Sequence, residues 1–161
     1  MNIRSLELRD PNFEARVRDS FARQRMMRLL GAELTTVLPG QIEIILPFRG
    51  ELTQQHGYLH AAAIAAIADS ACGYAALTLM EPGQEVLSVE FKVNLLAPAV
   101  GERFVAVGRV LRAGRTLTVC AADVHTGESV SGKLIAAMQA TMIAATFSKQ
   151  PQDKRTAEDG E

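Results

Sequence analysis

The segment from Gln54 to Met80, QQHGYLHAAAIAAIADSACGYAALTLM, decides the fold. Its polar, glycine-containing start leads into a run of about twenty residues that are almost all small and apolar. A helix that is apolar on every side belongs in a core with other elements packed around it. Asp69 is the one carboxylate in this run, and burying it ionised is costly without compensation. We therefore predict a buried central helix. Asp69 is a functional carboxylate, the buried partner of an arginine, or a residue at a point where the helix reaches the surface.

Composition limits the function classes. With 161 residues, 48% apolar and 22% charged, the chain is typical of one globular domain. The net charge of −1 does not favour a nucleic-acid or membrane-surface role. Cys72 and Cys120 lack the spacing of a zinc ribbon or a disulfide framework. The N-terminus lacks the apolar stretch of a secretion signal, and the run around Asp69 is too interrupted for a membrane span, so we expect a cytoplasmic protein.

The N-terminal part predicts a helix ahead of the main domain. Asp10-Pro11 is typical of a helix start, and Gly31 is a plausible end. The apolar positions recur at four-residue spacing, at Phe13, Val17 and Phe21. The other face carries Arg16, Arg23 and Arg25, which could contact a phosphate but which we interpret as solvated.

The remaining segments predict strands. We expect strands at 33–38, 42–48, 86–96, 103–112, 115–125 and 132–147. Alternation is clearest in 86–96, where we predict one buried face formed by Leu87, Val89, Phe91, Val93 and Leu95. Short turns between strands favour an antiparallel sheet, which would curl around the central helix in an α+β fold. We divide the chain into an N-terminal helical segment (1–32), a main domain (33–147) and a disordered tail (148–161).

Several polar residues are candidates for chemistry. The start of the central helix, at His60, Ala61 and Ala62, would present free N–H groups to a developing oxyanion. His56 and His60 have the spacing of some metal ligands, but without a third histidine nearby we do not favour a metal. The basic turn at Arg112 and Arg115 is either a solvated hairpin or a contact for ligand phosphates.

Spaced motifs then indicate a family. Gln54-x-x-Gly57-x-x-His60-Ala61-Ala62, with Asp69 nine residues after the histidine, resembles the active-site segment of hotdog-fold acyl-CoA thioesterases of the PaaI-like group. That group usually has N/Q-x-x-G-x-x-H-G-G there. The later segments that resemble its strands are Ser88 to Pro98 (SVEFKVNLLAP), Gly101-Glu102 and Gly114-Arg115-x-Leu117. The resemblance covers about residues 33–145.

The resemblance implies a hotdog fold and hydrolysis of a CoA thioester without a metal or other cofactor. Asp69 matches the catalytic carboxylate, which acts as nucleophile or as general base. Ala61 matches the residue whose N–H polarises the thioester carbonyl, Gln54 the amide that orients substrate or water, and Ser88 an assisting serine. With His60 these form the predicted catalytic set. The predicted substrate-binding residues are Gly57, Ala62, Asn94, Arg112 and Arg115.

Two positions depart from the family pattern. HGG is replaced by HAA, so the N–H groups remain but two methyl groups narrow the approach to them. Gly73, four residues after Asp69, stands where some members carry a hydroxyl-bearing residue.

Helix geometry independently predicts pairing of two chains. Nine residues at about 1.5 Å each separate the helix start from Asp69 by roughly 13 Å. One carbonyl must lie about 3 Å from both the oxyanion donor and the nucleophile. Two chains with antiparallel central helices could meet that requirement, so we expect a homodimer as the active unit, with a tetramer left open.

Two alternatives stand beside the thioesterase. A hotdog dehydratase or hydratase would use His56 or His60 with Asp69, although the proline-rich HFPxxP-type segment of fatty-acid dehydratases is absent. A non-catalytic acyl-CoA-binding module is the other alternative. The acyl group, and the choice between CoA and a carrier protein, are not determined by the sequence.

Overall fold

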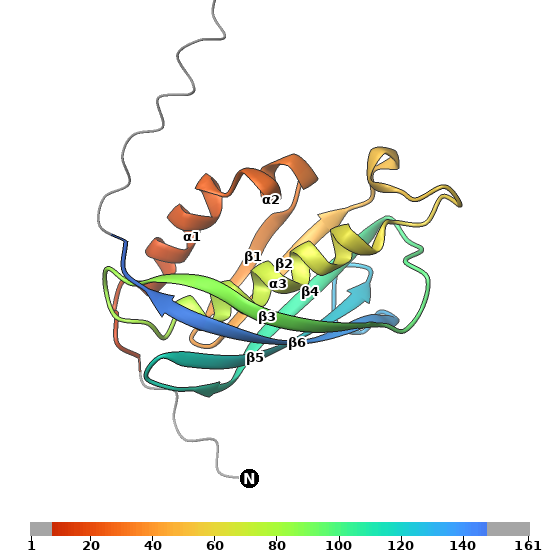
Figure 1. The fold of residues 1–161 in the computed structure, drawn as a ribbon. Coiled ribbons are helices and arrows are strands. Elements are labelled where there is room, and N and C mark those ends of the chain that lie inside the picture. Colours follow the sequence, from red (N-terminus) through yellow and green to blue (C-terminus); the bar gives the residue numbers. More distant parts are fainter. Residues whose placement is uncertain (1–7, 148–161) are drawn as a thin grey trace, which may run out of the picture.

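A computed structural model describes residues 8–147; the predicted tail, 148–161, lies outside them. The elements are α1 (Phe13–Arg23), α2 (Arg25–Leu30), β1 (Glu33–Leu38), β2 (Gln41–Pro47), the 3-10 helix η1 (Gly50–Leu52), α3 (Ala61–Leu77), β3 (Glu85–Leu95), β4 (Arg103–Ala113), β5 (Leu117–Thr126) and β6 (Leu134–Ala145). One antiparallel sheet, in the order β1-β2-β4-β5-β6-β3, curls around α3 (Figure 1). The predicted α+β hotdog architecture is confirmed. Within 8–147, no helix is long and apolar enough to cross a membrane.

Small residues let α3 lie directly on the sheet. Ala68, Ala71 and Ala75 are fully buried along the helix. Opposite them, a Cβ atom added to Gly108 in β4 would lie 2.3 Å from the carbonyl carbon of Ala71. Contact this close excludes any side chain at position 108, so the glycine is required by the packing of helix against strand. This contact fixes the height of α3 above the sheet.

The single N-terminal helix predicted from the sequence is wrong, because two helices occupy this part. Asn12 rather than Asp10 is the N-cap of α1, and Gln24 interrupts the helix with an extended backbone (ψ 101°). Met27 and Leu30, which are buried, do not continue the four-residue stripe of α1. The break changes the direction of the chain, so that the apolar residues of α1 and those of α2 both pack into the core. Gly31, at φ 73°, ends α2 as expected.

Arg16 is not solvated, contrary to the sequence interpretation. Its guanidinium donates hydrogen bonds of 2.8–3.3 Å to four carbonyl oxygens at the end of α3 and in the following turn, those of Leu77, Met80, Glu81 and Gln84. Its Nε lies 3.0 Å from a carboxylate oxygen of Asp10, which is itself buried. These contacts attach α1 to the last residue of α3 and to the turn that follows it.

The predicted buried face of β3 is wrong before its bulge and right in orientation after it, where Val93 packs against the core. The strand lies at the edge of the sheet, and a register shift between Ser88 and Glu90 turns its first residues over. Ser88 therefore faces α3, beside the fully buried Met142, while Leu87 is 47% exposed. Beyond the bulge, Phe91 does face inward, but it is 46% exposed because β3 has a strand on one side only within the described chain.

We expect Arg16→Ala to lower the free energy of unfolding by roughly 2–3 kcal/mol, because it removes four hydrogen bonds and leaves the buried Asp10 carboxylate without its cation. Urea denaturation measures the change. Arg18→Ala is the matched control on the same helix: its ion pair with Glu14 is exposed and should contribute less than about 1 kcal/mol. Equal losses in the two variants would contradict the anchoring role of Arg16.

Candidate active site

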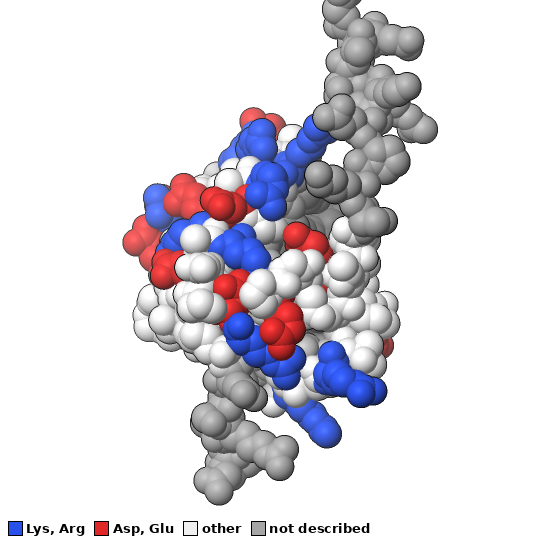
Figure 2. Space-filling view, turned by 90° about the vertical axis from the view of Figure 1, so that its left-hand side faces the viewer, with Lys and Arg blue, Asp and Glu red and all other residues white. Residues whose placement is uncertain are grey.

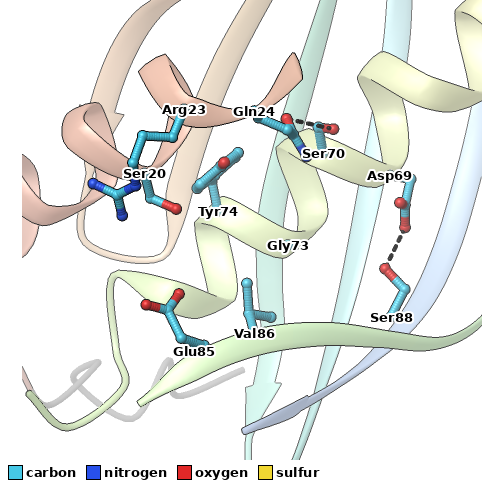
Figure 3. Close-up of a pocket in the computed structure, with 10 residues that line it drawn as sticks. All are labelled: Ser20, Arg23, Gln24, Asp69, Ser70, Gly73, Tyr74, Glu85, Val86 and Ser88. Atoms are coloured by element: carbon cyan, nitrogen blue, oxygen red, sulfur yellow. Dashed lines mark hydrogen bonds between the residues drawn. The ribbon is translucent and has the colours of Figure 1, made fainter. Parts of the chain in front are cut away.

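Asp69 lies at the middle of α3, half-buried, on the side that faces β3. The Ser88 hydroxyl donates a 2.7 Å hydrogen bond to its Oδ1 atom (Figure 3). The bulge after Ser88 makes this contact, because unbroken alternation would turn Ser88 away from α3. Burial raises the pKa of the Asp69 carboxyl, and the Ser88 hydrogen bond partly opposes that rise. The structure thus brings together two of the predicted catalytic residues.

Asp69 and Ser88 form one end of a cavity of about 310 Å³, which we call the Asp69 chamber. Gly73 and Tyr74 of α3 line it, and Ser20, Arg23 and Gln24 come from the N-terminal helices (Figure 3). Sequence reasoning missed these three residues. The only local signal was the helical pattern around them, and that pattern does not show that the chain breaks at Gln24 and meets α3.

The start of α3 presents one free backbone donor. His60 is the N-cap, and its Nδ1 atom accepts a 3.0 Å hydrogen bond from the Ala62 N–H. This bond requires a neutral ring with an unprotonated Nδ1. Ala61, the first residue of the helix, has no acceptor for its N–H within α3. Of the two N–H groups predicted at this site, the Ala61 group is therefore the one left for a substrate oxygen.

Gln54 lies beside Ala61 at a second cavity, of about 440 Å³. Its side-chain oxygen accepts a hydrogen bond from the His56 N–H, so the amide nitrogen keeps its donors. The turn after it depends on Gly57, whose φ of 83° favours glycine. The rest of the cavity is mainly apolar, with Ile64, Leu95 and Ile135 in its wall. This cavity can hold a chain that carries few polar groups.

One chain does not bring Asp69 and Ala61 together. They line different cavities that share no residue, and eight helical residues separate them by about 12 Å. The predicted catalytic set is thus divided into an Asp69–Ser88 half and a Gln54–Ala61 half.

The remaining predicted residues lie elsewhere. Asn94 pairs with Ala137 on the face of the sheet opposite α3, so it approaches neither cavity of its own chain. Arg112 in β4 and Arg115 in the next turn are exposed. On the side of the molecule shown in Figure 2, basic side chains are interspersed with acidic ones. Nearby in β4, Arg109 forms a 2.7 Å ion pair with Asp123.

Other chemistries find little support in residues 8–147. There, no three His, Cys, Asp or Glu side chains gather as a metal site would require. Burial raises the pKa of the Cys72 thiol, and it raises that of Cys120 to about 12, so neither is poised as a thiolate nucleophile.

Comparisons with known proteins identify the family of this chain. Residues 56–133 match the family model of the thioesterase superfamily. A thioesterase family protein from Silicibacter pomeroyi is 50% identical; the match covers 84% of this chain and 99% of that one, with a TM-score of 0.79. A second relative is SSO2140 of Saccharolobus solfataricus, which is named as a candidate esterase. It is 30% identical to this chain, and the match covers 59% of this chain and 67% of SSO2140.

The PaaI protein of Escherichia coli, from the phenylacetic acid degradation operon, supports the fold alone. It is 14% identical, and the match covers 86% of this chain and 96% of that one with a TM-score of 0.76. The matches in sequence and in structure agree on one family, and this chain therefore belongs to the thioesterase superfamily, with its hotdog fold.

Proposed function

We propose that this protein hydrolyses an acyl-CoA thioester to the free acid and CoA, with Asp69 as the reacting carboxylate. The observation that carries the proposal is a half-buried carboxylate with a raised pKa, held by Ser88 at a cavity wall, in a chain of the thioesterase superfamily. Carboxylates desolvated in this way are typical of general bases and nucleophiles.

The reaction needs a nucleophile, an oxyanion donor and a leaving thiol. Asp69 either attacks the thioester carbonyl itself or takes a proton from a water molecule that attacks it. The Ala61 N–H, at the positive end of α3, stabilises the negative charge that develops on the carbonyl oxygen. The carbon–sulfur bond breaks, the CoA sulfur takes up a proton that comes from the water, and the water oxygen becomes part of the acid. Where Asp69 attacks, water hydrolyses the resulting anhydride and restores the carboxylate. Gln54, with its amide donors free, orients the substrate or the water.

The separation of Asp69 from Ala61 supports a site shared by two chains. β3 is an eleven-residue edge strand whose apolar side chains, among them Val89, Phe91 and Leu95, are about half exposed. Exposed edges of this kind favour pairing with a further strand. Antiparallel pairing of two β3 strands would place two α3 helices side by side in opposite directions. Asp69 of one chain would then face Ala61 of the other.

The mainly apolar cavity beside Ala61 suits a slender thioester arm, and the pantetheine arm of CoA, whose methylene groups are interrupted by two amides, is such an arm. Arg112 and Arg115 stay proposed contacts for its phosphates. The hydratase alternative gains no support from His60, because its ring is engaged as the N-cap of α3.

Asp69→Asn should lower kcat/KM for the best acyl-CoA at least about a hundredfold, since the amide can act neither as base nor as nucleophile. Release of free CoA thiol from an acyl-CoA panel measures the effect. The melting temperature at neutral pH should not fall, because the amide avoids the desolvation cost that raises the pKa of the carboxyl. Asp123→Asn, which alters an exposed ion pair, is the control. Near-parental turnover in Asp69→Asn would refute the assignment.

Ser88→Ala should move the acid limb of the kcat/KM profile to higher pH. The reaction requires ionised Asp69, so kcat/KM falls as the pH drops through the pKa of this carboxyl. The Ser88 hydrogen bond lowers that pKa, and its loss raises it. Ser88→Thr keeps a hydroxyl and should restore the profile. An acid limb that does not move in Ser88→Ala would show that Ser88 does not set the ionisation of Asp69.

Mixed dimers test whether two chains share each site. Asp69→Asn removes the carboxylate, and Ala61→Pro removes the N–H. The second change suits the fold, because Ala61 is the first helical residue and His60 already has the extended backbone that proline requires before it (φ −66°, ψ 139°).

Equal amounts of the two variants, refolded together, should recover roughly a quarter of parental activity. Random pairing makes about half of the dimers mixed, and each mixed dimer holds one intact site of two. Circular dichroism checks the fold of each parent. Mixed dimers that form but stay inactive would rule out the shared site.

A further inference from the structure

Gly73 is a buried glycine in the middle of α3, where glycine destabilises a helix relative to alanine. Packing does not require it. A Cβ atom added there would find Val86 Cγ1 as its nearest neighbour, at 3.9 Å, which is an ordinary van der Waals distance. Gly108 differs, because backbone atoms of α3 block a side chain there. What Gly73 does provide is space, since it lines the Asp69 chamber one helical turn from the carboxylate.

The wall of this chamber beyond Gly73 is polar. The break at Gln24 brings its amide oxygen to 3.5 Å from the hydroxyl of Ser70, which is 7% exposed (Figure 3). Tyr74 extends from α3 toward α1, where Ser20 lies (Figure 3). Burial raises the pKa of Tyr74, so its hydroxyl stays protonated and can donate. Ser70 and Ser20 already bond the Gln24 amide oxygen and the Tyr74 hydroxyl, but the two N–H donors of the Gln24 amide have no acceptor among the described residues. An alkyl chain against this wall would remove these donors from water without giving them a partner.

The charges of the lining disfavour an anionic guest. Arg23 is the one cation among the lining residues, and it is exposed; Asp69 and Glu85 are both carboxylates. An acyl group with a second carboxylate would meet one screened positive charge and two negative ones. A neutral group that hydrogen-bonds meets neither penalty.

The size of the chamber limits the length of the guest. Its volume of about 310 Å³ corresponds to roughly ten water molecules in the bulk liquid. An acyl group of up to about eight non-hydrogen atoms fits this space.

We propose that the Asp69 chamber selects short acyl groups whose far end carries a neutral hydrogen-bonding group such as a hydroxyl. Gly73 provides the depth, and Gln24 and Tyr74 are the specificity-determining residues at the far wall. This inference rests on the proposed function, because it takes the chamber beside the reacting carboxylate as the place of the acyl group.

The test compares esters of equal size. We expect kcat/KM for 6-hydroxyhexanoyl-CoA to exceed that for heptanoyl-CoA by about tenfold, the effect of one hydrogen bond in a buried site. Adipyl-CoA, which ends in a carboxylate, should be poorer still. Gln24→Leu and Tyr74→Phe should each reduce the preference for the hydroxyl ester, and together they should remove it.

Gly73→Ala tests the depth. It should lower the ratio of kcat/KM for 6-hydroxyhexanoyl-CoA to that for acetyl-CoA by about tenfold, with a melting temperature equal to or above the parental value. Gly50→Ala is the matched control, because it adds the same methyl group where no atom lies within 4 Å. An unchanged ratio in Gly73→Ala would overturn the assignment of depth to Gly73.

The outcomes separate this inference from the proposed function. A parental enzyme that hydrolyses CoA esters but treats heptanoyl-CoA as well as its hydroxyl counterpart overturns the chamber selectivity and leaves the thioesterase standing. If no ester is hydrolysed, the proposed function fails. The chamber selectivity is then tested by calorimetry with two non-hydrolysable thioethers of CoA, which carry the 6-hydroxyhexanoyl-like chain and the heptanoyl-like chain. Tighter binding of the hydroxyl-bearing thioether by about tenfold supports the selectivity; equal binding, or none, overturns it.

Discussion

The contact between α3 and β4 is the constraint on which the rest of the structure depends. At Gly108 the strand approaches Ala71 so closely that no side chain fits between them. A helix made largely of alanine can lie this low, and the sheet curls around it with β2, β3, β4, β5 and β6 all in contact. A bulkier helix would need a wider sheet. The small residues that make α3 read as apolar on every side are therefore also the reason that this sheet can enclose it.

This enclosure is incomplete along β3, and Asp69, the proposed reacting carboxylate, lies there. Asp69 faces β3, which is the edge strand of the sheet and pairs only with β6 in the described chain, so the sheet ends beside this part of α3. Half burial raises the pKa of its carboxyl without making the ionised form prohibitively costly. The bulge in β3 adds the Ser88 hydroxyl, which favours the ionised form. Position at the edge thus gives a carboxylate that is desolvated, hydrogen-bonded and still reachable, and the same exposed edge favours pairing with a second chain.

The N-terminal helices connect the end of α3 to the site. Arg16 holds α1 against the last turn of α3 through four carbonyl oxygens. With α1 fixed there, the chain reaches Gln24 above the middle of α3, close to Ser70. Residues outside the sheet and its central helix therefore form one wall of the Asp69 chamber. Arg16 therefore contributes both to the stability of the fold and to the shape of the Asp69 chamber.

The sequence by itself determined the central helix, the strands and the residues that the superfamily motif carries. Those signals are local: a long, largely apolar run, alternation along strands, and the spacing from Gln54 to Asp69. Only the tertiary structure decided the roles of Arg16 and Gln24, and only it showed the bulge that turns Ser88 toward Asp69. Arg16 bonds a carbonyl 61 residues away, and Gln24 meets a serine 46 residues away. A local pattern cannot distinguish a solvated arginine from an anchoring one, because the partners of the arginine lie far away in the sequence. For the same reason it cannot locate a bulge, whose one-residue shift reverses which side chains of a strand face the core.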